Sequence, residues 1–338
     1  MAKIAINGFG RIGRAFLKLA IERPELEIVA INDLGDLENL AYLLRFDSVY
    51  GRYDKKVKVE NGKLVIDDKE IVFLQEKDAT KLPWDRLGVD IVIEATGVFE
   101  SYEKASTHKQ AGAKRVVLTA PAKDEDTEDN KTVLMGVNEE NIKSCSISSN
   151  ASCTTNSVAP VIQILVDKLG VKKAFLSTTH AMTTTQLLAD GPTKGSDLRR
   201  GRAASVNIAP STTGAAIAVT RAVKSLENKF DGMSLRVPVI DGSISVITFV
   251  SERPTTVEEI NNILKQAEGE PRWLGIFRTT TEQIVSTDII GEPCAALADL
   301  SLTKVVDGDL CTVFSWYDNE FGYTNTLVRH VLEIAKLF

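Results

Sequence analysis

The chain has 338 residues, a length that suggests two domains. Apolar residues make up 43% and charged residues 25%, which excludes a disordered, collagen-like or disulfide-scaffold protein. With 40 Lys and Arg against 46 Asp and Glu, the net charge is -6. This charge gives no reason to expect nucleic acid or an anionic membrane as the main partner.

The cysteines and the first residues point to a reducing compartment. Cys145, Cys153, Cys294 and Cys311 form no C-x-x-C pair, and their spacing fits no zinc template. The chain starts with an apolar strand pattern and lacks the basic start and the cleavage site of a signal peptide. No apolar run approaches the roughly 18 residues of a membrane span. We therefore expect a cytoplasmic protein without a metal site or a membrane segment.

The first half alternates short apolar runs with helical patterns, which predicts a parallel sheet with helices on both faces. Glu60, Asn61 and Gly62 suit a hairpin turn between two of the shorter runs. The expected elements are strand 3–7, helix 11–23, strand 27–32, helix 37–45, strands 56–59, 63–66, 70–73 and 89–95, helix 102–111 and strand 115–119.

The second half predicts a mixed or antiparallel sheet, because a hairpin turn at Asp307 and Gly308 joins two of its apolar runs. Thr256 and Glu259 suit a capping box. Residues 183–210 show little periodicity, and a loop of that length is functional or disordered. The expected elements are helix 154–168, strand 174–179, helix 214–226, strands 235–237 and 243–251, helix 257–267, strands 300–305 and 310–316, and helix 324–337.

A glycine-rich turn joins the first strand to the first helix. Gly8, Gly10 and Gly13 form a G-x-G-x-x-G pattern in the strand–turn–helix context that it requires. The first glycine permits the turn, the second lets the backbone approach a pyrophosphate, and the third lets the helix pack on the strand. Backbone N–H groups at the helix start attract the anion. The pattern predicts dinucleotide binding.

An acidic residue completes this signature. Asp33 ends the second strand about 20 residues after Gly13, where a carboxylate meets the adenosine ribose hydroxyls and repels a 2′-phosphate. The competing explanation is a structural glycine turn followed by an acidic helix cap. The joint spacing of strand, glycines, helix and acid favours a binding site for NAD over NADP.

A candidate nucleophile precedes the long helix of the second half. Cys153 would lie at the N-terminus of that helix, a position that lowers the pKa of a thiol. The small polar neighbours Ser152 and Thr154 leave the sulfur accessible and offer donors to an oxyanion or a phosphate. The alternative is a small buried cysteine, which is what we expect for the other three.

Three histidines are available as a base for this thiol. His180 follows strand 174–179 at a strand end, where functional loops begin. We expect His108, in a Lys-rich helical stretch, to be solvent-exposed, and His330 to be a packing or surface residue. A Cys–His pair is a recognised arrangement for an activated thiol, but the pattern alone leaves the pairing of Cys153 with His180 open.

The motifs together resemble those of the phosphorylating glyceraldehyde-3-phosphate dehydrogenases. They stand in that family's order along the whole chain and are individually specific. The matching segments are AINGFGRIGR at 5–14, INDL at 31–34, EATGVF at 94–99, APAK at 120–123, MGVN at 135–138, SNASCTTN at 149–156, PSTTGAA at 210–216, RVP at 236–238 and SWYDNE at 315–320.

The resemblance implies NAD-dependent oxidation of D-glyceraldehyde 3-phosphate with inorganic phosphate, which gives 1,3-bisphosphoglycerate in glycolysis and gluconeogenesis. Cys153 would attack the aldehyde to form a thiohemiacetal, with His180 as base and then acid. Loss of hydride would leave a thioester, which phosphate would then attack.

The resemblance also implies two anion sites and the cofactor contacts. For the substrate phosphate, the implied residues are Thr183, Arg200 and Arg236. For the attacking phosphate, they are Ser152, Thr154, Thr213 and Gly214. For NAD, they are Gly8, Gly10, Arg11, Ile12, Gly13, Asp33, Lys77, Thr96, Gly97, Thr119 and Asn319. Asn319 would bind the nicotinamide carboxamide, and Lys77 would act through its backbone.

The implied architecture is a Rossmann NAD-binding domain at residues 1–150 and an α+β catalytic domain with a mixed sheet at residues 151–321. The C-terminal helix, 322–338, would pack back on the first domain. The irregular segment 183–210 resembles the loop by which family subunits reach a neighbour's cofactor, so a homotetramer is expected.

Two alternatives stay open. Erythrose-4-phosphate dehydrogenase shares the fold and the Cys and His residues but releases its acid by hydrolysis, and the intact pattern around Thr154 and Thr213 argues against it. The second alternative is a non-catalytic protein that binds RNA or a protein partner, and the excess of acidic over basic residues argues against it. The acidic segment 123–132 receives no functional interpretation from the sequence.

Overall fold

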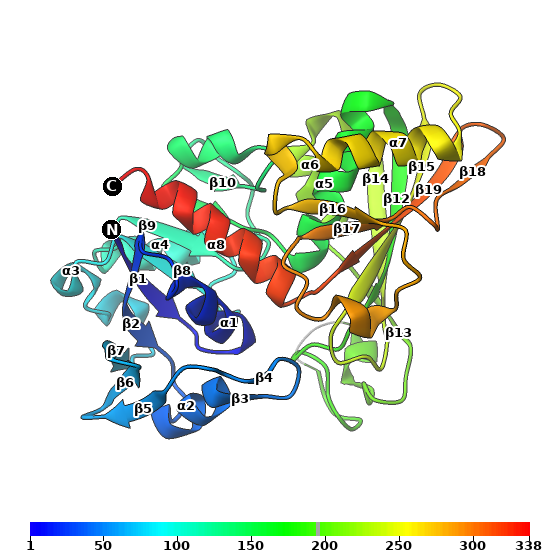
Figure 1. The fold of residues 1–338 in the computed structure, drawn as a ribbon. Helices are drawn as coiled ribbons and strands as arrows, with labels where there is room; N and C mark the ends of the chain where they lie inside the picture. Colours follow the sequence, from blue (N-terminus) through cyan, green and yellow to red (C-terminus); the bar gives the residue numbers. More distant parts are fainter. Residues whose placement is uncertain (194–196) are drawn as a thin grey trace. The chain divides into compact units, whose positions relative to one another are not determined.

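The computed structural model describes residues 1–193 and 197–338, so residues 194–196 of the irregular segment lie outside the description. The described chain divides into two compact units (Figure 1). Unit 1 comprises Met1–Ala151 and Leu327–Phe338, and unit 2 comprises Ser152–Thr326. The last helix, α8 (Phe321–Ala335), contributes residues to both.

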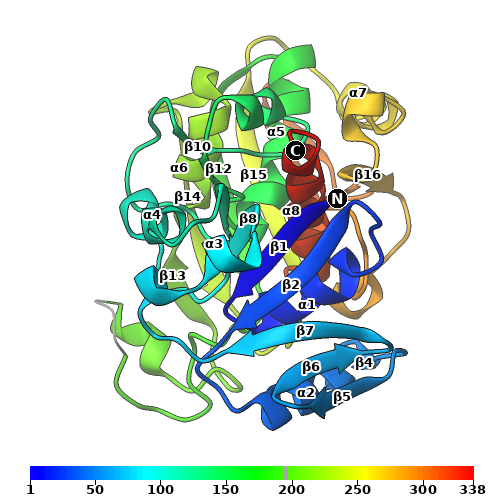
Figure 2. The same cartoon turned by 90° about the vertical axis from the view of Figure 1, so that its left-hand side faces the viewer.

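Unit 1 is built on a nine-stranded sheet with the order β10-β11-β9-β8-β1-β2-β7-β6-β5. The strands from β10 to β7 pair in parallel, and β5, β6 and β7 form an antiparallel meander at one edge (Figure 2). The strands are β1 Ala2–Asn7, β2 Leu26–Asn32, β5 Val57–Glu60, β6 Lys63–Ile66, β7 Lys69–Leu74, β8 Ile91–Glu94, β9 Arg115–Leu118, β10 Asn130–Thr132 and β11 Ile147–Ser149, with a separate hairpin of β3 Phe46–Asp47 and β4 Gly51–Arg52. The helices are α1 Arg11–Ala20, α2 Leu37–Arg45, α3 Trp84–Leu87 and α4 Tyr102–Gln110, with 3-10 turns at Ala79–Lys81 and Glu139–Lys143.

Alternation along the parallel strands decides which residues meet the helices. Ala5 of β1 and Val92 of β8 lie in a buried cluster with Ala105 of α4. Because side chains alternate with period two, the last residues of these strands, Asn7 and Glu94, point to the same face as Ala5 and Val92. That face of the sheet therefore carries polar side chains where its strands end.

Helix α1 ends at Ala20, three residues before the predicted end. Pro24 disfavours the helical conformation at the residue before it, and the chain turns with the Arg23 N–H bonded to the Ala20 carbonyl.

The acidic segment 123–132 has a structural role. Asp124 accepts hydrogen bonds from the Tyr102 and Glu103 N–H groups at 2.8 and 3.1 Å, so it caps the start of α4. Asp126 accepts from the N–H and the hydroxyl of Thr132, both at 2.9 Å. These carboxylates satisfy backbone donors that a loop would otherwise leave to water.

His330 of α8 is fully buried, and its ring bonds to residues in and just after β11. Its Nδ1 donates to Asn150 Oδ1 at 3.1 Å, and its Nε2 accepts from the Ser148 hydroxyl at 2.8 Å. Burial lowers the pKa of His330 to about 3. The imidazole is therefore neutral in the folded protein at pH 7.

This burial predicts acid sensitivity. Since the pKa of His330 is lower in the folded state than in the unfolded state, the unfolded state binds the extra proton as pH falls below about 6.5. The cost reaches about 2 kcal/mol at pH 5, from 1.36 kcal/mol per pH unit. His330→Gln removes the titrating group, so its stability relative to the wild type should improve as pH falls from 7.5 to 5 in chemical unfolding. A stability difference that does not change with pH would contradict this.

Unit 2 is built on an eight-stranded mixed sheet with the order β13-β14-β12-β15-β19-β17-β16, and β18 pairs with β19. Helices α5, α6 and α7 pack against this sheet (Figure 1). The strands are β12 Val171–His180, β13 Ala209–Thr212, β14 Phe230–Arg236, β15 Ser243–Ser251, β16 Phe277–Thr280, β17 Ala296–Asp299, β18 Lys304–Val306 and β19 Leu310–Tyr317. The helices are α5 Cys153–Lys168, α6 Ala215–Ala222 and α7 Val257–Glu268, with 3-10 turns at Leu198–Gly201, Lys224–Leu226, Pro271–Trp273 and Ser286–Ile289.

Three predicted elements of this half are wrong in extent. The predicted strand 235–237 coincides only with the end of β14, which begins at Phe230. The predicted strand 300–305 is a turn followed by β18, because the Asp299 carboxylate accepts the Ser301 N–H at 3.0 Å and ends β17. The predicted helix 214–226 ends at Ala222, after which Val223 leaves the helical conformation. The hairpin turn at Asp307 and Gly308 does join β18 to β19.

Within residues 1–193 and 197–338, no helix is both long and apolar enough to cross a bilayer. The same residues contain no cluster of His, Cys, Asp and Glu side chains that could hold a metal ion.

Candidate active site

Cys153 is the first residue of α5 in unit 2. The Ser152 hydroxyl caps the helix by accepting the Thr155 N–H at 3.1 Å. Ala151, just before the cap, is fully buried with a φ of 53°, so the chain enters the helix through a left-handed residue. The thiol is partly exposed, whereas the other three cysteines are buried, as predicted for them.

His180 faces this thiol from the end of β12. The distance from Cys153 Sγ to His180 Nε2 is 3.3 Å. On the other side of the ring, Nδ1 lies 2.7 Å from the Ala181 carbonyl oxygen. When Nδ1–H donates to that oxygen, the lone pair of Nε2 points at the thiol, which is the tautomer that a general base needs.

The pKa of the thiol differs from the expectation. Burial raises the pKa of Cys153, and the charge of Arg236 and the donors of Thr154 only oppose that rise. Burial, assisted by the same arginine, lowers the pKa of His180 to about 3. The prediction that the helix N-terminus sets a low thiol pKa is therefore wrong, because desolvation outweighs it. The pair rests as a neutral thiol beside a neutral imidazole.

Two arginines lie near this pair. The register of β12 on β14 sets His180 beside Arg236, whose guanidinium donates to the Ala181 carbonyl at 3.2 Å. The same guanidinium lies 2.9 Å from His180 Nδ1, which can accept from it only in the other neutral tautomer, with the ring proton on Nε2. Arg200 is anchored on the Ser211 hydroxyl of β13 at 2.9 and 3.1 Å. Its charge lowers the pKa of both Arg236 and His180, although burial is the larger cause for each. Two neighbouring guanidinium groups, whose described contacts are with a hydroxyl, an imidazole and a carbonyl, suit an anion.

A polar atom of Arg236 supports this interpretation. Its Nε is buried and has no hydrogen-bond partner within the described residues. The arginines on either side of Arg200 in this segment, Arg199 and Arg202, pair instead with carboxylates, Asp197 and Asp190 respectively, both at 2.8 Å. Of the predicted arginines, Arg236 contacts His180 directly, and Arg200 is near enough for its charge to act on His180 and Arg236.

The remaining predicted phosphate residues sit at helix starts and loops of unit 2. Thr154 is buried, and its hydroxyl bonds to the Tyr317 hydroxyl at 2.9 Å, so it faces the protein interior. Thr213 accepts the Ala215 N–H at 3.2 Å, and the exposed Gly214 begins α6. The Thr183 hydroxyl bonds to the Thr185 hydroxyl at 3.0 Å.

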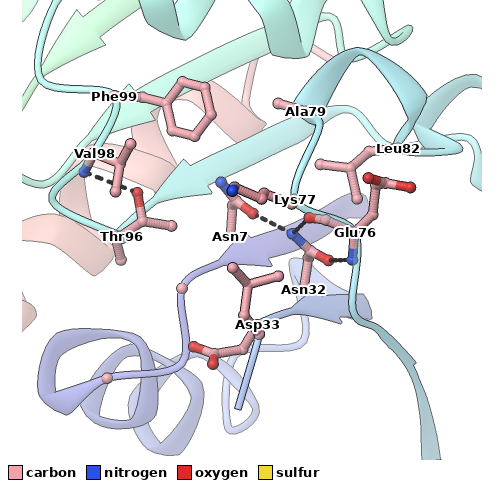
Figure 3. Close-up of a pocket in the computed structure, with 14 residues that line it drawn as sticks. Asn7, Asn32, Asp33, Glu76, Lys77, Ala79, Leu82, Thr96, Val98 and Phe99 are labelled. Atoms are coloured by element: carbon pink, nitrogen blue, oxygen red, sulfur yellow. Dashed lines mark hydrogen bonds between the residues drawn. The ribbon is translucent and has the colours of Figure 1, made fainter.

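Unit 1 contains a cavity of about 430 Å³ at the carboxyl ends of its parallel strands (Figure 3). This is the edge where doubly wound sheets bind ligands. Of the predicted cofactor residues, those that line it are Gly8, Gly10, Asp33, Lys77 and Thr96.

Of the three glycines in the turn, two have no room for a side chain. Gly8 has a φ of 98°, and a Cβ there would lie 2.6 Å from the Ala95 backbone. A Cβ at Gly13 would collide with the Gly8 carbonyl oxygen, whereas Gly10 faces open space. The backbone of the turn is therefore free to approach a ligand at Gly10.

Asp33 is held rigidly at the end of β2. Its two carboxylate oxygens accept the Phe9 N–H at 2.6 Å and the Gly35 N–H at 2.8 Å. The charge thus lies beside the glycine turn, where it favours ribose hydroxyls and repels a second phosphate.

Other predicted cofactor residues lie outside the lining of this cavity. The Arg11 side chain turns to Asp47 at 2.7 Å, and Thr119 bonds to the Glu94 carbonyl through both its N–H and its hydroxyl at 3.0 Å. Ile12 follows Arg11 in α1, and Gly97 follows Thr96 with a φ of 68°. Asn319 belongs to unit 2, where its Oδ1 accepts the Ser243 hydroxyl at 2.7 Å.

The cavity also contains residues that sequence reasoning missed. They are Asn7, Asn32, Leu34, Glu76, Ala79, Leu82, Ala95, Val98 and Phe99. Several of them end a parallel strand or follow its end, which is a signal that the sequence does carry.

A glycine turn and an acidic residue at a cavity of a Rossmann-type sheet, with a Cys–His pair in a separate unit, are the features expected of a nicotinamide-dependent dehydrogenase that works through a thiol. Comparison with known families agrees. Residues 2–102 match the family described as glyceraldehyde 3-phosphate dehydrogenase, NAD binding domain, and residues 152–319 match its C-terminal domain. The chain therefore belongs to the glyceraldehyde-3-phosphate dehydrogenase family.

Curated relatives named glyceraldehyde-3-phosphate dehydrogenase align over the full chain. The protein of Thermotoga maritima is 50% identical over 340 residues and 100% of both chains. That of Clostridium pasteurianum is 46% identical over 100% of this chain and 99% of its own. That of Geobacillus stearothermophilus is 44% identical over 99% and 98%. The predicted family, fold class, enzyme class and NAD cofactor are confirmed.

Proposed function

We propose that the protein oxidises D-glyceraldehyde 3-phosphate with NAD and inorganic phosphate to 1,3-bisphosphoglycerate. The observation that carries this proposal is the 3.3 Å contact of Cys153 with His180, beside the two arginines, in a chain of this family. Residues 1–150 would hold the cofactor and residues 151–321 the chemistry, with helix 322–338 completing the first domain.

The thiol and the imidazole act as one unit. His180 takes the Cys153 proton as sulfur bonds to the aldehyde carbon and returns that proton to the aldehyde oxygen, which gives the thiohemiacetal hydroxyl. The neutral imidazole then removes this hydroxyl proton as hydride leaves the carbon and the thioester forms. Because burial lowers its pKa, His180 is neutral at pH 7, and a ring nitrogen is therefore unprotonated. NAD, when bound, accepts the hydride that leaves the thiohemiacetal carbon.

Separate donor groups would hold the two phosphates. Arg236, Arg200 and Thr183 would bind the substrate phosphate, and the free Nε of Arg236 offers a further donor. The second anion would lie at the helix starts formed by Ser152, Thr154, Thr213 and Gly214. A phosphate held there attacks the thioester in place of water, which preserves the energy of oxidation as an acyl phosphate.

The cavity of unit 1 fits the dinucleotide. The glycine turn leaves room at Gly10 and nowhere else in the motif, and Asp33 supplies the fixed carboxylate. The residues that would hold NAD are Gly8, Gly10, Arg11, Ile12, Gly13, Asp33, Lys77, Thr96, Gly97 and Thr119, together with Asn319 of unit 2 for the carboxamide.

Removal of the Asp33 carboxylate should relax cofactor choice. In Asp33→Ala, the repulsion of a 2′-phosphate disappears, and the preference for NAD over NADP in kcat/KM should fall at least about tenfold, since 1.4 kcal/mol corresponds to that factor. The measurement compares both cofactors at saturating aldehyde and phosphate. An unchanged cofactor ratio would remove Asp33 from its selecting role.

The fate of the thioester tests the proposed reaction against the hydrolytic alternative, erythrose-4-phosphate dehydrogenase. Acyl-enzyme formed by mixing NAD and aldehyde with the protein should persist in phosphate-free buffer and decay rapidly when phosphate is added. Equally fast decay in both buffers would favour hydrolysis.

We also propose a homotetramer. In unit 2, Phe175 of β12 is 46% exposed and Leu310 of β19 is 43% exposed, and both line a cavity of about 760 Å³ with Ile217. In the irregular segment, Leu188 and Val206 are 83% and 75% exposed. Apolar groups gathered in this way are typical of surfaces that a second copy covers. Light scattering should give four times the chain mass.

A cytoplasmic location is part of the proposal. All four cysteines, which lie within the described residues, are free thiols, and Cys153 must stay reduced to act. A reducing compartment keeps it so. Neither nucleic acid nor a membrane is proposed as a primary partner.

A further inference from the structure

His108 is not exposed, as the Lys-rich helix suggested, but fully buried under the dinucleotide cavity. The prediction failed because the contacts that bury it come from distant parts of the chain. Its Nδ1 receives the Trp84 Nε1–H at 3.2 Å, and its Nε2 lies 2.9 Å from Glu94 Oε2. Its ring also contacts Phe99, a residue of the cavity wall, with centroids 5.4 Å apart.

These contacts fix the hydrogen-bonding role of each ring nitrogen. An indole N–H can only donate, so His108 Nδ1 must accept. A neutral imidazole then carries its proton on Nε2 and donates it to the Glu94 carboxylate.

Glu94 is the centre of the hydrogen bonds that follow. Its Oε2 accepts from His108 and from the Asn7 amide at 2.6 Å. Its Oε1 accepts from the N–H of Thr96 at 2.8 Å and from the Thr96 hydroxyl. That hydroxyl in turn accepts the Val98 N–H at 3.1 Å, which fixes the turn (Figure 3).

The network continues across the ends of neighbouring strands. Asn7 Oδ1 accepts from the Asn32 amide at 2.8 Å. The same Asn32 side chain bonds to both the N–H and the carbonyl of Glu76 at 2.9 Å (Figure 3). The last residues of β8, β1 and β2 and the loop after β7 are thereby joined side chain to side chain. Each of these segments supplies residues to the cavity.

We propose that His108 and Glu94 are positioning residues for NAD, which fix the Thr96 turn and the Asn7 end of the cavity before the cofactor binds. The proposal rests on NAD binding in this cavity. His108 supplies one of the four donors that hold the Glu94 carboxylate. Without it, the carboxylate can rotate and release its hold on Thr96 and Asn7. The wall must then be ordered by the cofactor itself, which weakens binding.

Two substitutions separate the donor from the packing. His108→Phe keeps an aromatic ring against Phe99 but removes the donor to Glu94, and His108→Gln keeps an amide N–H in the same direction. His330→Gln is the matched control, because His330 is equally buried in unit 1 but bonds to Ser148 and Asn150. Calorimetric titration of NAD into the full chain measures each Kd, and thermal unfolding checks folding.

The Kd for NAD should rise about tenfold or more in His108→Phe, stay within about threefold in His108→Gln and be unchanged in the control, since each tenfold corresponds to 1.4 kcal/mol. At saturating NAD, kcat and the KM for the aldehyde should remain those of the wild type. If His108→Phe does not fold, Glu94→Gln tests the same role of the carboxylate. The NH₂ group of the glutamine amide cannot accept a hydrogen bond, so it must lie against at least one of the donors that Glu94 now binds.

A Kd in His108→Phe within twofold of the wild type would overturn the proposal, and so would equal weakening by Gln and Phe. Failure of the wild-type protein to bind NAD would instead overturn the proposed cofactor site, which keeps the two results distinct.

Discussion

Cys153→Ser should lower phosphate-dependent dehydrogenase activity by at least about 10⁴-fold while leaving NAD binding intact. A serine hydroxyl in this position has a far higher pKa than the thiol and forms no thioester. His180 would then have to take its proton from a hydroxyl, which is a much weaker acid than a thiol. Initial rates of NADH formation and the Kd for NAD measure the two effects separately.

Cys311→Ser is the matched control for this substitution. Cys311 is buried in β19 of the same unit, and its thiol bonds to the Asp309 carbonyl. This variant should retain activity within about twofold when its folding is intact. Substantial activity in Cys153→Ser would exclude Cys153 as the nucleophile.

His180→Asn should lower kcat by about 10² to 10⁴-fold, the usual contribution of a positioned base. In this variant the thiol must ionise without help, and its pKa is raised by burial. The reactivity of Cys153 in this variant would then follow the fraction of thiolate and rise steadily as the pH increases through 9. In the wild type, the reactivity of Cys153 should depend far less on pH near neutrality.

The alkylation rate of Cys153 by iodoacetamide across pH 6 to 10 is the direct measurement for this pair. His330→Gln serves as the comparison, because it removes a buried histidine that does not contact the thiol. An alkylation profile in His180→Asn equal to that of the wild type would show that His180 is not the base.

The sequence predicted those parts of the molecule whose physical cause is local. The glycine turn at Gly8 to Gly13 and the acid at Asp33 depend on a spacing within one strand–helix–strand unit, and the structure places Gly8, Gly10 and Asp33 at one cavity. Cys153 at a helix start followed from the onset of helical periodicity. The longer strands and helices were predicted to within a few residues for the same reason.

Contacts between distant segments could not be predicted in this way. The burial of His108 depends on Trp84 and Glu94, which its own helix does not reveal. The pKa of Cys153 depends on desolvation and on Arg236, which arrives from a neighbouring strand through sheet register. Short strands such as β11 and β16 carry too few residues to show a period of two.

The most direct test of the central claim is NADH formation from glyceraldehyde 3-phosphate and NAD, with and without inorganic phosphate. We expect sustained turnover only when phosphate is present, with at most one equivalent of NADH per active site without it. Full turnover in the absence of phosphate, above all with erythrose 4-phosphate, would contradict the proposed reaction.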